Sequence, residues 1–349
     1  MIELGCALAG AALGLALGVK LGRRPERVAD ARRDTRIVCL GGGHGLSTLL
    51  RGLKVHTSRL TAIVTVADDG GSSGRLRQEY RVLPPGDVRN CLAALASRDD
   101  LIARMFQFRF EGAGELSGHS LGNLLLTGLG AITGDFLEAI RVSGDFLGIT
   151  GEVLPSTLQP VRLWAVRADG TVVEGESRIP EKGQAIRELH LSLDDPDPAP
   201  GVLERIAAAQ LIVLGPGSLY TSILPNRLVP RIRAAIAQAR CPVLVVMNVM
   251  TQPGETDGFS VGDHLRVLRE LGGLRRVHRV LVHDGAPDAD ARRRYAEAGA
   301  HPVELDRATI EELGDGIVKA DVAGGAAFHH DPAKLAQAIL GVLDDGIVI

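Results

Sequence analysis

Residues 36–54 read RIVCLGGGHGLSTLLRGLK, and this stretch decides the fold class. Its first part, Arg36–Leu40, is a short apolar run typical of a buried strand. Four of the next five positions, Gly41–Gly45, are glycine, and Leu46–Lys54 has the apolar spacing of a helix. Strand, glycine turn and helix in this order are typical of an α/β protein with a parallel sheet. The stretch therefore predicts the first strand and crossover helix of such a sheet.

This first loop departs from the familiar phosphate-binding fingerprints. Gly41 and Gly43 fit the start of GxGxxG, but Leu46 stands where the third glycine is required, and the loop is not a P-loop either. Glycines ahead of a helix still expose several N–H donors to an anion. The alternative is a plain turn between strand and helix with no ligand role. The candidate ligand contacts in this loop are Gly42, Gly43, His44 and Gly45.

Further apolar runs recur along the chain and end on polar loops. These runs are Leu60–Ala67, Leu211–Leu214, Val243–Met247, Val277–Val282 and Ile317–Val322. In open α/β sheets ligands bind beyond the carboxyl ends of the strands, so we expect the loops after residues 40, 67, 214 and 247 to converge. The predicted fold is a Rossmann-like α/β domain spanning residues 36–349.

A small antiparallel insertion, at about residues 159–195, interrupts this pattern. Val161–Ala168 and Thr171–Ser177 flank an Asp-Gly turn and predict a hairpin, with Leu189–Leu193 as a candidate third strand. We expect this insertion to form an edge sheet or subdomain.

The second polar loop, residues 68–75, reads DDGGSSGR and combines carboxylates, amides, hydroxyls and a guanidinium. Such a loop suits a diphosphate with or without Mg²⁺, for which Asp68 and Asp69 are tentative ligands. Alternatively, one of the two carboxylates accepts from ribose hydroxyls, or the segment is a solvated turn. The candidate residues here are Asp68, Asp69, Gly70, Gly71, Ser72, Ser73 and Arg75.

Two motifs further along mark helix starts. Residues 84–90, PPGDVRN, predict a helix with Asp87 as N-cap and Asn90 in its first turn. Residues 118–122, GHSLG, match the GxSxG pattern of a hydrolase elbow, but the polar segment before them is not the strand that an elbow needs. We expect a helix start there, with His119, Ser120 and Asn123 facing outward as ligand contacts or caps.

The second half of the chain offers two more oxygen- and amide-rich loops. Residues 215–222 read GPGSLYTS and follow one predicted strand, and Asn248 with its successors follows the next. Such loops suit a sugar or a nucleotide. The candidates are Gly215, Gly217, Ser218, Thr221, Ser222, Asn248, Thr251 and Gln252.

Composition excludes several function classes. The net charge of −3 gives no positive field for DNA or RNA, and 11 aromatic residues in 349 leave too few rings for a base-stacking strip. The four cysteines are widely spaced, with no CxxC pair, which indicates a reduced, cytoplasmic chain.

Residues 1–35 precede the predicted domain and form a leader of different composition. Residues 2–19 carry a single charge, and residues 20–36 follow with a net charge of +4. We interpret residues 1–22 as a candidate membrane anchor and 23–35 as a charged tether, which would hold the body at the inner face of the plasma membrane. The alternative is a Gly/Ala-rich leader that never inserts.

The ordered motifs resemble those of the YvcK/CofD family. The similarity spans about residues 36–260 and continues more faintly to about residue 345. It is closer to the YvcK-type gluconeogenesis or morphogenesis factors than to the CofD-type 2-phospho-L-lactate transferases. The motifs read GGGHGLSTLLRGLK, TAIVTVADDGGSSGRLR, PPGDVRNCLAAL, GHSLGNLLL, ITGDF, LPST, LIVLGPGSLYTSILPN and MTQPGET.

The resemblance implies a Rossmann-like fold that binds a nucleotide diphosphate compound at these loops. For the YvcK type the implied ligand is a UDP-sugar such as UDP-N-acetylglucosamine, with a role in cell shape, wall-precursor supply and carbon flux under gluconeogenic growth. Tyr295 matches a tyrosine that contacts the uridine end in similar proteins. Two positions depart from the pattern: His44 stands where many relatives have Thr, and His329 begins a His-His-Asp in place of Arg-His-Asp.

Two functions remain open at this point. The first is a non-enzymatic sensor that binds a UDP-sugar and controls a protein partner in amino-sugar or wall-precursor metabolism. The second is a Mg²⁺-dependent transferase, in which Asp68 and Asp69 hold the metal while Asn90 and Asn123 position an acceptor. A purely structural scaffold would leave the polar loops unexplained. The partner and any homo-oligomer are not decided by the sequence.

Overall fold

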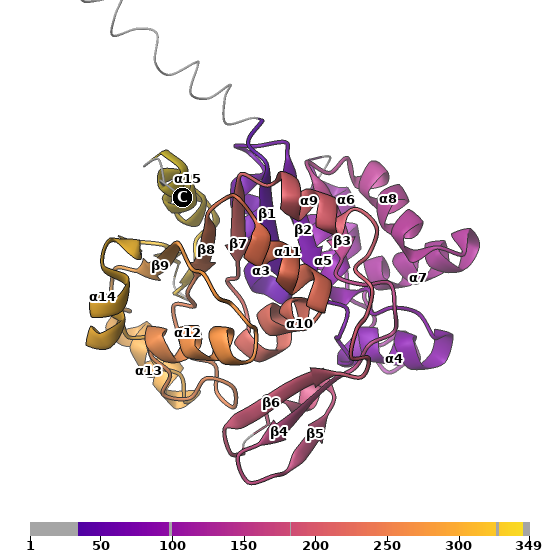
Figure 1. Ribbon diagram of the computed structural model, residues 1–349. Helices are drawn as coiled ribbons and strands as arrows, with labels where there is room; N and C mark the ends of the chain where they lie inside the picture. Colours follow the sequence, from indigo (N-terminus) through magenta and orange to yellow (C-terminus); the bar gives the residue numbers. More distant parts are fainter. Residues whose placement is uncertain (1–33, 98–99, 182, 326–327, 345–349) are drawn as a thin grey trace, which may run out of the picture.

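A seven-stranded, wholly parallel sheet forms the centre of the molecule (Figure 1). The computed structural model describes residues 34–97, 100–181, 183–325 and 328–344. The strand order is β10-β9-β8-β7-β1-β2-β3. The strands are β1 Ile37–Gly41, β2 Leu60–Val64, β3 Glu152–Pro155, β7 Leu211–Leu214, β8 Val243–Val246, β9 Arg279–His283 and β10 Ile317–Ala320.

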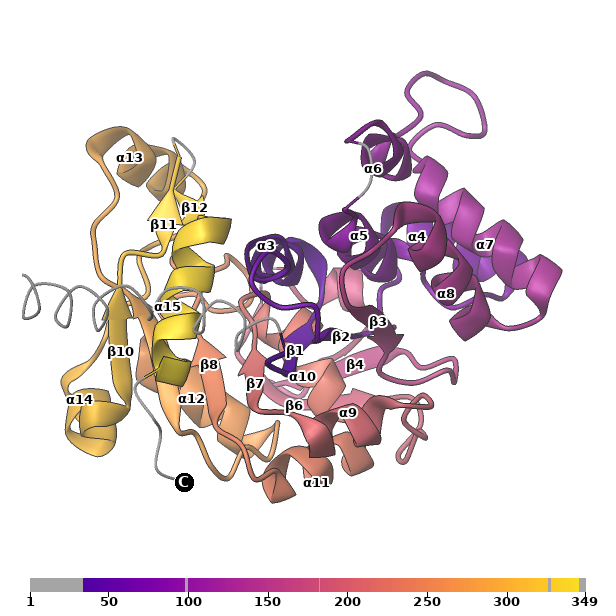
Figure 2. The ribbon, with the colours of Figure 1, turned by 90° about the horizontal axis from the view of Figure 1, so that it is seen from above.

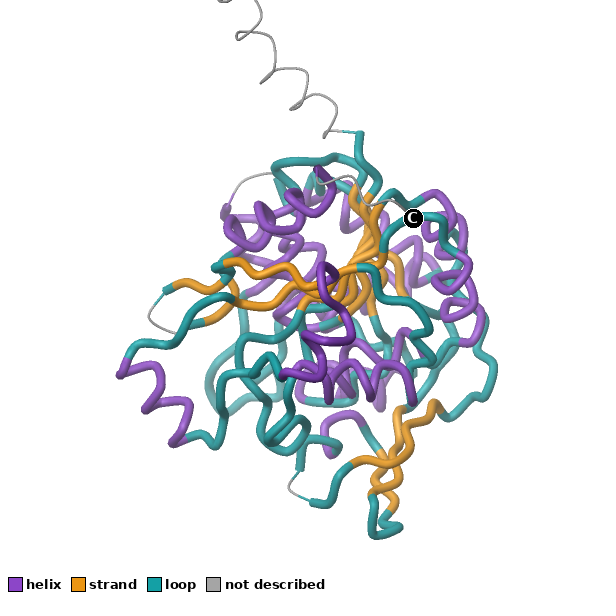
Figure 3. The backbone as a smooth tube through the Cα atoms, turned by 60° about the vertical axis from the view of Figure 1, so that its left-hand side comes forward, coloured by secondary structure: helices purple, strands orange, loops and turns teal. Residues whose placement is uncertain are grey.

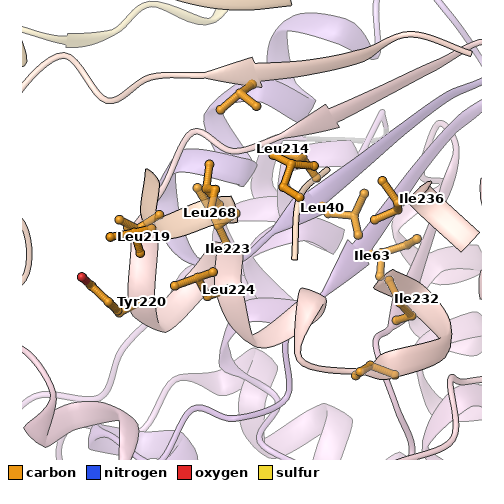
Figure 4. Close-up of a cluster of buried hydrophobic side chains, with 14 of the residues drawn as sticks. Leu40, Ile63, Leu214, Leu219, Tyr220, Ile223, Leu224, Ile232, Ile236 and Leu268 are labelled. Atoms are coloured by element: carbon orange, nitrogen blue, oxygen red, sulfur yellow. The ribbon is translucent and has the colours of Figure 1, made fainter. Parts of the chain in front are cut away.

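Both faces of this sheet are buried, which explains why its strands are continuous apolar runs. Along β1, Ile37 and Cys39 belong to one hydrophobic cluster, and Val38 and Leu40 belong to the other. Figure 4 shows part of the second cluster, where Leu40, Ile63 and Leu214 meet side chains from the helices of that face. The alternation of side chains along a strand thus gives the molecule two cores.

Helices cover the sheet on both sides (Figures 2 and 3). One face is covered by α3 Gly43–Leu53, α5 Gly86–Leu95 and α15 Pro332–Asp344. The other is covered by α9 Val202–Ala208, α10 Leu224–Arg227, α11 Pro230–Gln238 and α12 Val261–Glu270. Towards the β3 edge lie α4 Gly71–Tyr80, α6 Asp100–Gln107, α7 Leu121–Thr133 and α8 Phe136–Leu147. Towards β10 lie α13 Ala289–Glu297 and α14 Arg307–Leu313.

The predicted insertion is an antiparallel sheet of three strands that projects from the body (Figure 1). Its order is β5-β4-β6, so the candidate third strand pairs with the first strand of the hairpin. The strands are β4 Leu163–Arg167, β5 Val172–Glu174 and β6 Ile186–Leu191. A short turn of 3₁₀ helix, η1 Glu176–Arg178, follows β5. The fold class, α/β with a small antiparallel insertion, is confirmed.

Several local expectations need correction. Residues 68–75 are not one long loop, because α4 begins at Gly71 and takes Ser72, Ser73 and Arg75 into its first turns. Asp87 is not the N-cap of α5: Pro85 holds that position, and Asp87 lies inside the first turn. The short pair β11 Ala323–Gly324 and β12 His329–His330, and the edge strand β3, were not expected.

No helix in the described part of the chain is long and apolar enough to span a membrane. The candidate anchor, residues 1–22, and nearly all of the charged tether lie outside the described residues. Their interpretation stays a prediction.

Candidate functional site

The loops after β1, β2, β7 and β8 meet at the carboxyl edge of the sheet, because these four strands are neighbours. Successive strands are added outward on one side of β1 as far as β3 and then on its other side from β7 onward, and a doubly wound sheet opens a crevice at such a switch point. The first and third loops are in direct contact: a β-carbon on Gly45 would lie 2.4 Å from the carbonyl oxygen of Pro216. Glycine at position 45 is therefore required for this approach, and the expected convergence is confirmed.

A cavity of about 630 Å³ lies between these loops. Its size is within the usual range for small-molecule sites. It brings together twelve of the predicted residues: Gly42, Gly43, His44, Gly45, Gly217, Ser218, Ser222, Asn248, Thr251, Gln252, Tyr295 and His329.

The cavity wall is held by a hydrogen-bonded pair of loops. The Asn248 side chain accepts from the Gly217 amide at 3.0 Å and donates to the Gly217 carbonyl at 2.9 Å. It also donates to the side chain of Gln252 at 3.2 Å. Asn248 thus fixes the loop after β7 to the loop after β8. An apolar side chain at this position would lose both hydrogen bonds to Gly217.

A buried carboxyl group supports the next turn of the same wall. Ser218 caps the helical turn η2 Leu219–Ile223, because its hydroxyl accepts from the Thr221 amide at 3.1 Å. The Ser218 hydroxyl donates to Glu255, which also accepts from the Tyr220 amide. Burial raises the pKa of Glu255. Ser218 and Thr221 therefore have structural partners, and Ser222 is left beside Gly42 at the cavity.

A cluster of three carboxyl groups lies next to the cavity on the β2 side. Burial, together with the Asp68 charge, raises the pKa of Asp87 to about 7, although the Gly43 amide opposes this by donating to it. Burial and again Asp68 raise the pKa of Glu176 to about 8. Burial also raises the pKa of Asp68. At neutral pH the cluster therefore holds protons that ordinary surface carboxylates would have lost.

Asp69 lies beside this cluster and anchors the insertion. Its two carboxylate oxygens accept from the amides of Glu176 at 3.1 Å and Ser177 at 2.9 Å. This contact carries Glu176 into the site, where its side chain is hydrogen-bonded to Thr221. Sequence reasoning missed Glu176, because nothing in its own neighbourhood signals a contact with a residue about a hundred positions earlier.

The predicted Mg²⁺ site is only partly compatible with this geometry. Both Asp69 oxygens already accept backbone amides, so of the two predicted ligands Asp68 is the one that faces the cluster. Within the described residues no group of three His, Cys, Asp or Glu side chains is placed to hold a metal ion. Mg²⁺ commonly binds through one or two carboxylates plus ligand phosphates, and such a site at Asp68 stays a prediction.

His119, Ser120 and Asn123 are buried, and not outward as expected. Ser120 caps α7 by accepting from the Asn123 amide, as predicted. His119 and Asn123 both reach the Ser72 hydroxyl, with Nδ1 and Nδ2 each 3.0 Å from it. The Oδ1 atom of Asn123 is buried without a partner among the described residues. These three side chains join α4 to α7, and Asn123 keeps one acceptor free.

The other predicted residues lie further from the cavity. Asn90 accepts from Arg89 at 2.7 Å, inside the packing of α5. Arg75 donates to the Ser117 carbonyl at 2.6 Å and so holds the loop before α7. Gly70, Gly71 and Ser73 shape the start of α4 beside Asp68, and Gly215 lies under the β7 loop. These contacts are all within the protein and assign no ligand role to these residues.

The far end of the cavity is formed by the C-terminal part of the chain. The Tyr295 hydroxyl lies 2.8 Å from His329 Nδ1, which ties α13 to β12. Thr48 and Arg51 complete the wall and were missed, although they follow His44 at four and seven positions along α3. That spacing places all three on one helix face and would have identified them.

Comparisons with known proteins show which family this chain belongs to. Residues 37–323 match the family described as 2-phospho-L-lactate transferase CofD. The chain is 47% identical to the gluconeogenesis factor of Halalkalibacterium halodurans, over 87% of this chain and 95% of that protein. It is 43% identical to the gluconeogenesis factor of Bacillus subtilis, over 89% of this chain and 98% of that protein. A crystal structure of a UPF0052 family member from Bacillus halodurans superposes with a TM-score of 0.84 at 46% identity, covering 88% of this chain and 99% of that chain. The chain therefore belongs to the YvcK/CofD family, together with these gluconeogenesis factors.

Proposed function

We propose that this gluconeogenesis-factor relative binds a UDP-sugar of the UDP-N-acetylglucosamine type in the 630 Å³ cavity and acts as a non-enzymatic regulator. The observation that carries the proposal is the composition of the cavity wall, in which glycine amides of one loop face the amide side chains of another. Such a wall suits a ligand with phosphates at one end and a polar base or sugar at the other.

The phosphate end would lie at the start of α3. No acidic residue occupies the first turn of this helix, and Gly42–Gly45 line the cavity, although the Gly43 amide already donates to Asp87. A helix N-terminus favours negative charge, and Arg51 on the same helix adds a guanidinium to the wall. The uridine end would lie at Tyr295, the residue that the family resemblance assigns to it.

Calorimetry with UDP-N-acetylglucosamine tests the proposal directly. We expect heat of binding with the full chain, and binding at least tenfold weaker in Asn248→Ala, which removes both hydrogen bonds to Gly217. Asp194→Asn, an exposed change outside the cavity, is the matched control. An absence of heat up to millimolar ligand would exclude the proposed ligand.

The transferase remains the second candidate, and one observation favours it. The carboxyl group of Asp87, with its pKa near 7, and that of Glu176, with its pKa near 8, are suited to exchange a proton at neutral pH. Following the ligand by ³¹P NMR with Mg²⁺, with and without an acceptor, separates the two functions. Release of a phosphate-containing product that requires the acceptor, at a rate that Glu176→Gln lowers, would establish the transferase.

The cellular role is proposed from the family alone. We infer a function in cell shape, wall-precursor supply and carbon flux under gluconeogenic growth, exerted through a protein partner and near the inner face of the membrane if residues 1–22 insert. A strain lacking the protein should then lose normal shape or growth on gluconeogenic carbon sources. Restoration by the wild-type chain and not by Asn248→Ala would connect that role to the cavity.

A further inference from the structure

A second cleft, distinct from the 630 Å³ cavity, lies between α4 and the three-stranded insertion. Its volume is about 950 Å³. It shares no lining residue with the first cavity. A ligand in one would therefore not occupy the other.

The cleft is lined by four arginines: Arg77, Arg81, Arg162 and Arg178. Only two carboxylates, Asp69 and Glu174, share the lining, and Asp69 already accepts two backbone amides. In the described chain, Arg81 and Arg162 have no ion-pair partner, and the Arg178 guanidinium is 3.9 Å from Glu181. The lining thus carries four positive charges against two negative ones.

Arg77 is the most buried of the four arginines, and the charges of Asp69 and Asp68 offset part of its own charge. Its Nη2 donates to the Val161 carbonyl, while its Nη1 is buried and has no acceptor among the described residues. Burial and the nearby Arg162 charge lower the pKa of Arg77. An anion beside these two guanidinium groups would offset both the burial and the mutual repulsion.

The backbone conformation of Arg81 does not favour an arginine at this position. It ends α4 in the left-handed region, at φ 56°, where helices usually place glycine or asparagine. An arginine there carries a conformational cost that glycine would avoid. Its guanidinium lines the cleft, which is a reason for arginine at this position that the fold itself does not provide.

We propose that this arginine cleft binds a small molecule carrying two or more phosphate groups. Arginine binds phosphate in a bidentate way, and a recess of this volume accommodates a small molecule better than a flat surface would. The cleft adjoins the carboxyl cluster of the main site, since Asp69 lines the cleft and accepts from the amide of Glu176, whose side chain belongs to that cluster. Occupancy of the cleft is therefore positioned to alter ligand binding in the main cavity.

The tryptophan of the chain gives a direct test. Trp164 lines the cleft and is the single tryptophan of the sequence, so its fluorescence reports on this place. We expect a saturable fluorescence change on titration of the full chain with pyrophosphate at constant ionic strength, and a weaker response with inorganic phosphate. The absence of a saturable change up to 10 mM, on the order of the weakest binding of interest, would overturn the proposal.

Substitutions then locate the binding. Arg81→Gly should weaken pyrophosphate binding at least fivefold while thermal stability stays equal or rises, because the change relieves the left-handed backbone. Arg162→Ala should weaken it similarly. Arg187→Ala, on β6 of the same insertion but outside the cleft lining, is the matched control and should bind as the wild type does. Equal affinity in Arg81→Gly, Arg162→Ala and the wild type would refute the assignment.

Two further measurements separate this proposal from the proposed function. Asn248→Ala alters the main cavity only and should keep the pyrophosphate response of Trp164. Calorimetry with UDP-N-acetylglucosamine, with and without saturating pyrophosphate, measures coupling between the sites. If pyrophosphate binding disappears in Asn248→Ala and persists in Arg81→Gly, the anion binds in the main cavity and the cleft proposal fails.

Discussion

Two adjacent aspartates have opposite roles in this site, and their difference begins with where each carboxylate finds donors. Asp69 accepts two backbone amides of the insertion, whereas Asp68 accepts from the Gly70 amide at 2.9 Å and lies with Asp87 and Glu176. The sequence DD predicts that both residues matter, but it carries no information on which one faces the ligand. That choice depends on the position of η1, which is about a hundred residues away.

At the residue scale we predict that Asp87→Asn stabilises the fold at alkaline pH. The pKa of Asp87 in the folded chain is about 7 against 3.8 ordinarily, so the folded state binds the proton more tightly than the unfolded state. The stability lost to its ionisation builds up as pH rises from about 4 to 7. Asn keeps an acceptor for the Gly43 amide and cannot ionise.

Thermal denaturation checks this prediction. Asp87→Asn should melt a few degrees above the wild type at pH 8, a gain of up to ~4 kcal/mol, and at nearly the same temperature at pH 4. Asp194→Asn, which changes an exposed aspartate, should show no such pH-dependent difference. A lower melting temperature for Asp87→Asn at pH 8 would mean that its charge is compensated in the fold.

At the scale of elements, the contact of α3 with the loop after β7 is the most sensitive. Gly45→Ala places a methyl group 2.4 Å from the Pro216 carbonyl oxygen, so the two loops must separate. We expect a loss of ~1–3 kcal/mol of stability and weaker binding of UDP-N-acetylglucosamine. Gly128→Ala is the matched control, because a methyl group at this exposed position of α7 meets nothing within 4 Å.

Urea denaturation of both variants measures the difference. Gly128→Ala should be neutral or stabilise by up to ~1 kcal/mol, since alanine favours the helix. If Gly45→Ala is as stable as the wild type and binds ligand normally, the two loops are not held together as the structure indicates.

The elements also show what sequence patterns predict well and poorly. Long apolar runs that end on glycine loops, such as β1 and β7, were predicted with bounds close to the observed ones. Glu152–Pro155 was missed because a strand of four residues with a charge and a proline has no clear periodicity. The start of α4 was missed because glycine and serine are weak helix formers, so DDGGSSGR has the composition of a loop.

The candidate site, like the strands and helices, was predicted in part. Residues in the glycine loops were predicted to lie together, because their composition is unusual and parallel strands bring such loops together, and many of them line one cavity. His119 and Asn123 were found but placed outward, since polar side chains are mostly exposed and only the packing of α4 on α7 buries them.

At the scale of the whole molecule we predict that ligand affinity depends on pH. Asp87, with a pKa of about 7, and Glu176, with a pKa of about 8, are neutral below these values and become negative above them. An anionic diphosphate is then repelled, so affinity without Mg²⁺ should fall about tenfold or more between pH 6 and pH 9. Mg²⁺ should reduce this fall, because ionised carboxylates favour the cation.

Calorimetry across this pH range, with Mg²⁺ and with a chelator, gives the measurement. Glu176→Gln should remove the part of the fall that occurs near pH 8. A flat profile in the presence of the chelator would show that the three carboxyl groups do not face the bound phosphates.

The leader gives a second prediction at this scale. Removal of residues 1–22 should leave affinity for UDP-N-acetylglucosamine within about twofold, because the residues that line the cavity lie between Gly42 and His330. It should also move the protein from the membrane fraction to the soluble fraction of cells, in washes with high salt and carbonate. Full-length protein that is already in the soluble fraction would remove the anchor from consideration.

The central strand has a consequence for synthesis of the chain. β1 pairs on one side with β2, which follows within about thirty residues, but on its other side with β7, where Ile37 meets Leu211. A ribosome that adds about 5–20 residues per second needs roughly ten seconds or more to make the intervening chain. Throughout that interval the nascent β1 presents an open edge of buried-type residues, which is the kind of surface that pairs with other chains. Protection of that edge during translation, by a chaperone or by slow release from the ribosome tunnel, is therefore a requirement that the strand order places on the cell.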